Sequence, residues 1–313
     1  VKSVTPDTVF RTASIAKAVC ALLVMRLQTQ GKLSMEEDIS AFWHETIRNP
    51  HHPDVEIPLG SLLSHTSGMV DSPLYFRSFA EDITADTLLR DGASFSDALP
   101  YGRFRYSNFA AGLIGSLLEA RFQTSFEDLI QTELFRPLGV WATFDITKAD
   151  AGNIADGYRV LPPGRKPTFD ARARLRSSQP IGAPDPQRHF LLASGNLYIT
   201  AGNMARLCLV MMNGGEGFIN GKSMQNLRTT GREGTAHWRG MRHGMGLFRL
   251  EDESVLPRPL YGHQGFAYGA VNGFFFDEKG DGFVSFNSGA SEQRVGRLSL
   301  MNRDLIRVLL SEP

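Results

Sequence analysis

The chain has 313 residues, of which 42% are hydrophobic and 21% charged, values typical of a globular enzyme. Its 33 basic residues balance 33 acidic ones, so net charge gives no reason to expect binding to nucleic acid or to an anionic membrane surface. No apolar run reaches the roughly eighteen residues that a membrane-spanning helix needs, so we expect none. Cys20 and Cys208 both lie in apolar, helical-looking stretches, and we interpret them as buried free thiols rather than nucleophiles.

The first predicted helix covers residues 13–30 and ends at Gly31, a residue type common just past a helix C-terminus. It is apolar almost all round beyond Lys17, so it should be a central, buried helix. An acidic stretch at 34–38 starts another helical segment, and residues 57–63 lead into a turn-rich Ser-His-Thr-Ser-Gly sequence.

Residues 70–105 mix scattered apolar positions with Gly and Pro, which predicts an irregular helical insert. A second long helix is predicted at 109–122, and Ser125 with Asp128 has the spacing of a capping box at the start of a third. Residues 145–193 are rich in Pro, Gly, Arg and Asp. A loop region of that length inside a compact domain is often functional, and we expect it to form a rim over an active site.

After a further predicted helix at 200–213, the pattern changes from about Gly244 to strands separated by Gly and Asp turns. The β-rich runs cover residues 246–251, 261–269, 272–277 and 282–287. The Lys-Gly-Asp-Gly sequence at 279–282 predicts a hairpin, and residues 293–310 predict an amphipathic helix. This order indicates an α+β fold, with an antiparallel sheet flanked by a helical part. We expect one domain over residues 1–313, with the helical and loop part at about 35–190 inserted between the first helix and a sheet at about 240–310.

Ser14 and Lys17 are three residues apart at the start of the buried helix, so their side chains share one face. The helix dipole favours negative charge on the serine oxygen, and both the dipole and burial oppose protonation of the lysine. A lysine held partly neutral can take the hydroxyl proton, which makes a serine nucleophilic without a histidine. The alternative is a capping serine beside a lysine that extends to solvent.

Tyr106 and Asn108 stand immediately before the second long helix. A phenol near a lysine can share its proton and act as a base or proton shuttle. The Asn108 amide can donate to a substrate carbonyl and accept from the lysine. The alternative is that Tyr106 is a core aromatic residue and Asn108 an ordinary helix N-cap.

His263, Gly265 and Phe266 lie in a predicted strand. A glycine in a strand allows another backbone or a substrate to approach closely. The backbone N–H of Phe266 would then face the same point as the N–H of Ser14, and two such groups would form an oxyanion hole. Without these neighbours, His263 would be interpreted as a hydrogen-bonded core histidine.

The Tyr-x-Asn and His-x-Gly elements each occur once, and with Ser-x-x-Lys they follow the order helix, helix start, strand. This arrangement resembles the serine beta-lactamase and penicillin-binding protein family, in the branch of class C beta-lactamases, DD-peptidases and esterases. The sequences at 8–13, 62–68 and 193–200 also resemble that family, so the resemblance covers about residues 5–310. It implies a beta-lactamase/transpeptidase-like fold.

The chain departs from the family pattern in two places. The third element is Lys-Thr-Gly in true beta-lactamases, whereas here it is His263-Gln264-Gly265, which resembles the peptidase and esterase members. Only thirteen residues precede Ser14, whereas the family normally has a helix and a strand pair there. We therefore expect the sheet to lack the N-terminal strand pair, and an uncovered sheet edge makes self-association plausible.

The resemblance implies a serine hydrolase that forms an acyl-enzyme on Ser14, with Lys17 and Tyr106 as proton-transfer partners. Its substrate would be a small amide or ester: a D-amino-acid peptide, an ester or a beta-lactam. Esterase or D-peptidase activity is favoured over true beta-lactamase activity. The alternatives are a penicillin-binding sensor or pseudo-enzyme that acylates without efficient turnover, and a purely structural domain.

No cofactor, nucleic-acid partner or metal is expected. His51 and His52 are adjacent and have no third ligand at a suitable spacing, and His65 is interpreted as fixing a loop through hydrogen bonds. A periplasmic or extracellular location follows from the resemblance, with a cytoplasmic one left open.

Overall fold

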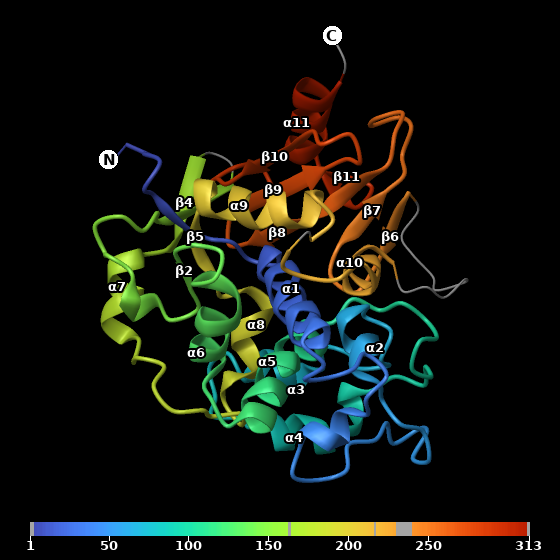
Figure 1. The fold of residues 1–313 in the computed structure, drawn as a ribbon. Coiled ribbons are helices and arrows are strands. Elements are labelled where there is room, and N and C mark those ends of the chain that lie inside the picture. The colour runs from blue at the N-terminus through green and yellow to red at the C-terminus, as the bar shows by residue number, and fades with distance from the viewer. Residues whose placement is uncertain (1–2, 162–163, 216, 230–239, 312–313) are drawn as a thin grey trace.

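A long buried helix, α1 (Ile15–Thr29), runs through the centre of the computed structural model, which describes residues 3–161, 164–215, 217–229 and 240–311. A helical part lies on one side of α1 and a sheet on the other (Figure 1). Residues on every face of α1 are buried, from Ile15 to Leu27. The prediction of a central helix that is apolar all round is confirmed.

The helical part consists of short helices packed around the longer helix α5. Buried residues of α1 and of α5 belong to one hydrophobic cluster. It contains α2 (Leu59–Leu63), α3 (Pro73–Arg77), α4 (Ala85–Arg90), α5 (Asn108–Phe122), α6 (Phe126–Ile130) and the π-helical turn η3 (Gln131–Phe135), with the 3-10 turns η1 (Ile39–Phe42), η2 (Gly92–Ser94), η4 (Ile146–Lys148) and η5 (His189–Leu191). Ser125 caps α6 as predicted, since its Oγ accepts the N–H of Asp128 at 3.1 Å. The acidic stretch at 34–38 forms turns that lead only into η1.

The large sheet is antiparallel and has the strand order β10–β9–β8–β7–β6. Its strands are β6 (Met241–His243), β7 (Phe248–Leu250), β8 (Leu260–Ala267), β9 (Ala270–Phe276) and β10 (Gly282–Ser285). Alternation along β9 divides the core, because Phe274 and Phe276 join the cluster around α1 and α9 (Ala201–Met212), whereas Phe275 joins the cluster of α11 (Leu300–Leu310). The sheet is thus covered on both faces.

A smaller sheet, β1–β5–β2, lies beside the start of α1. It consists of β1 (Val9–Arg11), β5 (Tyr198–Thr200) and β2 (Ala142–Thr143). The residues just before Ser14 therefore pair with β5 and not with the large sheet, whose outer strands are β10 and β6. The predicted fold class, an antiparallel sheet flanked by helices, is confirmed.

Several elements differ from the expectation for their segment. Residues 145–193 were expected to be loop-dominated, but they contain the hairpin of β3 (Gly157–Leu161) and β4 (Gly164–Phe169) and the helix α7 (Ala171–Ser177). No residue of β3 is buried, and its apolar residues Tyr158, Val160 and Leu161 are exposed, so this strand has no core-facing side that composition would reveal. The remaining short elements are α8 (Leu192–Gly195), α10 (Gly221–Arg228), β11 (Arg294–Val295) and β12 (Leu298–Ser299). Because β11 and β12 occupy the start of the segment predicted to be helical, α11 begins later than predicted.

Cys20 and Cys208 are both free and buried, as predicted. Burial raises the pKa of each thiol to about 12, which keeps it protonated at neutral pH. Within the described residues, no helix has the length and apolar character needed to cross a membrane.

Candidate active site

Ser14 occupies the N-cap position of α1, but its side chain makes no capping hydrogen bond. The preceding residue, Ala13, has φ = 53°, a left-handed conformation that a residue with a Cβ rarely adopts. This sharp turn between β1 and α1 directs the hydroxyl away from the helix end and toward Lys17, whose Nζ lies 3.2 Å from Ser14 Oγ. The alternative of a capping serine is therefore wrong.

Lys17 is buried and its Nζ has three oxygen neighbours. These are Ser14 Oγ at 3.2 Å, Asn108 Oδ1 at 2.9 Å and the carbonyl oxygen of Ser194 at 2.5 Å. The pKa of Lys17 is lowered to about 7, mainly by burial; the negative charge of Asp71 opposes this shift, and the positive charge of Arg11 adds to it. The alternative of a lysine that extends to solvent is also wrong.

Tyr106 brings a phenol to the same point. Its hydroxyl is hydrogen-bonded to that of Ser14, and Lys17 Nζ lies 5.2 Å from the centre of its ring. The ring packs against His65 at a centroid distance of 4.3 Å. Burial is the main reason that the pKa of Tyr106 is raised, so the phenol stays protonated at neutral pH.

Asn108 is fixed between Lys17 and Asp71, a residue that the sequence analysis did not identify. Asn108 Nδ2 donates to Asp71 Oδ2 at 2.7 Å, while its Oδ1 accepts from Lys17. Asp71 also accepts from Ser107 Oγ at 3.0 Å and from the N–H of Phe109 at 2.8 Å, so one carboxylate organises the start of α5. In the sequence, Asp71 is recognisable only as an acidic residue three positions after Gly68, at the end of the Ser-Gly turn.

Strand β8 passes directly beside the Ser14 turn at Gly265. A Cβ at this position would lie 2.2 Å from the carbonyl oxygen of Thr12 and 3.2 Å from the backbone nitrogen of Ser14, so no larger residue fits here without a shift. The next residue in the strand is Phe266, whose ring lies 4.2 Å from the Arg294 guanidinium. Gln264 points to the other face, where its Oε1 accepts the N–H of Ser299.

His263 lies on the same face of β8 as Gly265 and is completely buried. Its ring stacks on Phe248 at 4.2 Å, and its Nδ1 lies 2.7 Å from the carbonyl oxygen of Gln264. Because a carbonyl only accepts, Nδ1 carries the hydrogen and donates it. Burial, with a smaller effect from Lys17, lowers the pKa of His263 to about 3, so the ring is neutral at physiological pH.

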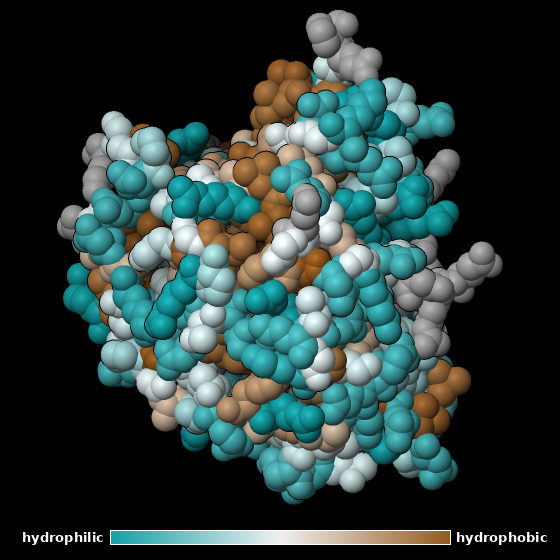
Figure 2. All heavy atoms as spheres, viewed as in Figure 1, coloured by the Kyte–Doolittle hydropathy of each residue, from teal (hydrophilic) through white to brown (hydrophobic). Residues whose placement is uncertain are grey.

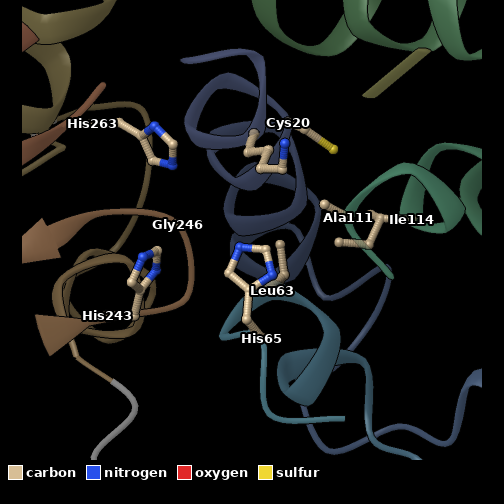
Figure 3. Close-up of a pocket in the computed structure, with 9 residues that line it drawn as sticks. Cys20, Leu63, His65, Ala111, Ile114, His243, Gly246 and His263 are labelled. Atoms are coloured by element: carbon tan, nitrogen blue, oxygen red, sulfur yellow. The ribbon is translucent and has the colours of Figure 1, made fainter. Parts of the chain in front are cut away.

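A small cavity next to Lys17 is lined by three histidines, His65, His243 and His263 (Figure 3). The His65 and His243 rings are 5.3 Å apart, and those of His243 and His263 are 6.3 Å apart. His65 also accepts the N–H of Ser107 at its Nδ1 (3.3 Å), so it fixes the loop before α5 as the sequence analysis expected. Among the described residues, no three His, Cys, Asp or Glu side chains are placed to hold a metal ion.

The participation of His243 was not foreseen, because it lies on β6, a strand of only three residues with no recognisable pattern. The structure thus brings Ser14, Lys17, Tyr106, Asn108 and His263, together with Asp71 and His243, to one place at the junction of the helical part and the sheet.

Comparison with known proteins assigns the chain to a family. The family model for beta-lactamases matches residues 1–304. The chain belongs to the beta-lactamase family. Beta-lactamase-like protein 2 of Dictyostelium discoideum is 26% identical over 215 residues, which cover 67% of this chain and 37% of that protein. The chain therefore spans little more than a third of the length of the first curated relatives that it matches.

Several solved structures share the fold. EstCE1, described as a hydrolase with promiscuous acyltransferase activity, superimposes with a TM-score of 0.75 at 22% identity over 98% of this chain and 86% of that one. The D-amino acid amidase of Ochrobactrum anthropi SV3 has a TM-score of 0.71 at 21% identity, covering 98% and 84%. An octameric penicillin-binding protein homologue from Pyrococcus abyssi has a TM-score of 0.67 at 20% identity, covering 92% and 63%.

Proposed function

We propose that this protein is a serine hydrolase that forms an acyl-enzyme on Ser14. The observation that carries the proposal is the set of three contacts at Lys17 Nζ. Two of the three partners, Asn108 Oδ1 and the Ser194 carbonyl, can only accept hydrogen bonds. A neutral lysine has two N–H groups, which these acceptors engage, so its lone pair faces the Ser14 hydroxyl.

In the acylation step, Lys17 takes the Ser14 proton while Oγ attacks the substrate carbonyl carbon. The N–H groups of Ser14 and Phe266 stabilise the resulting oxyanion. Tyr106, which is protonated before the reaction begins, donates its proton to the leaving group as the scissile bond breaks. Lys17 then returns a proton to the phenol. Water then attacks the acyl-enzyme by the same route in reverse, which releases the acid and restores Ser14.

We propose small esters or D-amino-acid amides as substrates, in preference to cephalosporins. At the third motif position, beta-lactamases carry a lysine, whose charge can pair with the carboxylate of a beta-lactam. His263 is buried and neutral, so it offers no such charge. Among proteins of the same fold are one described as a hydrolase and one named a D-amino acid amidase.

Intact-mass spectrometry tests the nucleophile. A fluorophosphonate should add one adduct to the wild-type protein and none to Ser14→Ala, and hydrolysis of a p-nitrophenyl ester should fall by several orders of magnitude in that variant. Turnover within tenfold of wild type would show that another residue reacts. A stable mass shift of an acyl group with no turnover would identify an acylating sensor in place of a hydrolase.

The substrate preference has a separate test. The kcat/KM for p-nitrophenyl esters or D-amino-acid amides should exceed that for a cephalosporin. Efficient cephalosporin hydrolysis, with esters left intact, would show that the neutral His263 does not select against beta-lactams.

A further inference from the structure

Arg11, three residues before Ser14, donates its side-chain hydrogen bonds to an amide oxygen. Its Nε and Nη2 both donate to Asn196 Oδ1, at 3.1 and 2.8 Å, and its guanidinium lies 5.6 Å from the centre of the Tyr268 ring. In the part of the chain that the structure describes, no carboxylate lies within salt-bridge distance of Arg11. A partly buried guanidinium whose hydrogen bonds go to one neutral amide is costly unless a ligand completes its hydrogen bonds.

Arg11 lines a pocket beyond the end of β8, together with Tyr268, Asp156, Asn287 and Ser288. The side chains of Asn287 and Ser288 already have hydrogen-bond partners, and one oxygen of the Asp156 carboxylate accepts a backbone N–H. Asn287 bonds to both backbone groups of Val271, and Ser288 Oγ donates to the carbonyl of Asp156. The Asp156 carboxylate, the acidic group of this lining, accepts the N–H of Ala171 at 2.9 Å.

Tyr268 is held in an unusual conformation over this pocket. Its φ is 54°, in the left-handed region that a tyrosine rarely adopts, and half of the residue is exposed. Strand β8 ends at Ala267, so the turn that follows presents the Tyr268 ring beside Arg11. The Arg11 guanidinium, with the Tyr268 ring beside it, is therefore the cationic group that the pocket offers to a ligand.

The pocket lies at one end of the proposed reaction site. Along β8, His263 belongs to the histidine cavity, Gly265 meets the Ser14 turn, and Tyr268 follows just beyond the strand. Tyr106, the proposed proton donor to the leaving group, packs on His65 at the histidine end. The leaving group therefore departs at that end, and the acyl part of a substrate extends toward Arg11.

We propose that Arg11 and Tyr268 form a subsite that binds a carboxylate on the acyl part of the substrate. This inference rests on the proposed hydrolase function and narrows its substrate class to esters or amides of acids with a second, free carboxyl group. A guanidinium that is fixed at Nε and Nη2 by Asn196 presents its remaining N–H groups to such a carboxylate.

The test compares mono-p-nitrophenyl esters of adipic and suberic acid with their methyl-capped, neutral counterparts, after correction for spontaneous hydrolysis. For wild type, the free acids should have kcat/KM at least about tenfold higher, the scale of one charge-assisted contact. A control pair of esters carries the free carboxylate, or its methyl ester, on the leaving phenol instead of on the acyl part. For this pair we expect equal kcat/KM. Equal rates for acid and methyl ester, or a preference only for the carboxylate on the phenol, would overturn the subsite.

Two variants attribute the preference to Arg11. Arg11→Met removes the guanidinium, and Asn196→Asp keeps it but neutralises it with a bound carboxylate; each should reduce the ratio of acid to methyl ester to near one. Arg90→Met is the matched control, because Arg90 lies on the distant α4 and pairs with Glu45 at 2.7 Å. A ratio that persists in both Arg11→Met and Asn196→Asp, each shown to be folded by fluorophosphonate labelling, would refute the assignment.

Failure of the hydrolase proposal is distinguishable from failure of the subsite. Calorimetry with the Ser14→Ala variant measures binding of the uncleaved adipate ester, and binding should weaken about tenfold when the carboxylate is methylated. Binding with this preference but without turnover in wild type would refute the hydrolase and retain the subsite. Turnover of neutral esters without any preference for a carboxylate would refute the subsite and retain the hydrolase.

Discussion

At the scale of single residues, the surroundings of Lys17 act on its pKa in two opposite directions. Burial and Arg11 favour the neutral amine, and Asp71 favours the ammonium ion, so that the pKa falls to about 7. An amine with this pKa keeps a substantial neutral fraction at neutral pH and still binds a proton strongly enough to remove it from a serine. The same compromise makes the proposed catalysis sensitive to pH.

We expect kcat/KM for a neutral ester to rise with pH, with a midpoint at about 7. Below that pH the ammonium ion has no lone pair to accept the Ser14 proton, and above it the amine is free to do so. Initial rates measured between about pH 5 and pH 9 check this, with spontaneous hydrolysis subtracted. A rate that is independent of pH across that range would show that Lys17 is not the group that takes the proton.

Asp71 offers a test of positioning. In Asp71→Asn, Asn108 loses the carboxylate that orients it, so kcat for an ester should fall about 10- to 100-fold with little change in KM. Removing the negative charge should also lower the Lys17 pKa and move the midpoint of the pH profile to lower pH.

The two readouts separate this role from mere structural support. A variant that is only less stable would lose activity equally at every pH and keep the wild-type midpoint. Asp54→Asn is a matched control, because Asp54 lies at an exposed loop position outside the site.

The sequence could identify the motif residues, since Ser14, Lys17, Tyr106, Asn108 and His263 each occupy a recognisable local pattern. It could not identify Asp71, because the contact of Asp71 with Asn108 depends on how a loop 37 residues earlier in the chain folds back on the start of α5. An isolated acidic residue in a loop is ordinarily solvated, so no local signal marks it.

At the scale of elements, the long periodic segments were predicted well, and several of the short ones were missed. The helices α1, α5 and α9 and the strands β8, β9 and β10 have enough residues to show their period. Strands β1 and β5 have three residues each and exist because they pair with one another, Val9 opposite Thr200. Tertiary pairing, which local propensity cannot reveal, decides such elements.

The contact between β8 and the Ser14 turn predicts the effect of Gly265→Ala. The new Cβ would meet a backbone oxygen, that of Thr12, at 2.2 Å, so β8 must move away from the turn. Displacing Phe266 from Ser14 should lower kcat by about 100-fold or more, the scale of losing one oxyanion donor, and the strain should cost about 1–3 kcal/mol of unfolding free energy.

Ester kinetics and thermal unfolding measure both effects. Gly221→Ala is the matched control, because a Cβ at Gly221 meets no atom within 4 Å. Activity of Gly265→Ala within threefold of wild type would show that the close approach of β8 is not needed for catalysis.

At the scale of the whole molecule, the large sheet has an outer strand, β10, next to an apolar surface. Within the described residues no further strand pairs with the outer edge of β10. In Figure 2, hydrophobic groups gather beside this strand and over α9, where Leu209 is 48% exposed. An unpaired strand edge bordered by apolar groups is a site at which chains associate.

We therefore expect self-association that uses the β10 edge. Light scattering across a concentration range should give a mass that rises above that of one chain, and hydrogen exchange should show amides of β10 becoming protected as the mass rises, because pairing engages their N–H groups. Leu209→Lys should shift the association to higher concentration by placing charge in the apolar surface, whereas Val295→Lys, on the exposed strand β11, serves as the control. A constant mass of one chain at all concentrations would contradict the prediction. Association without protection of β10 would place the contact on another surface.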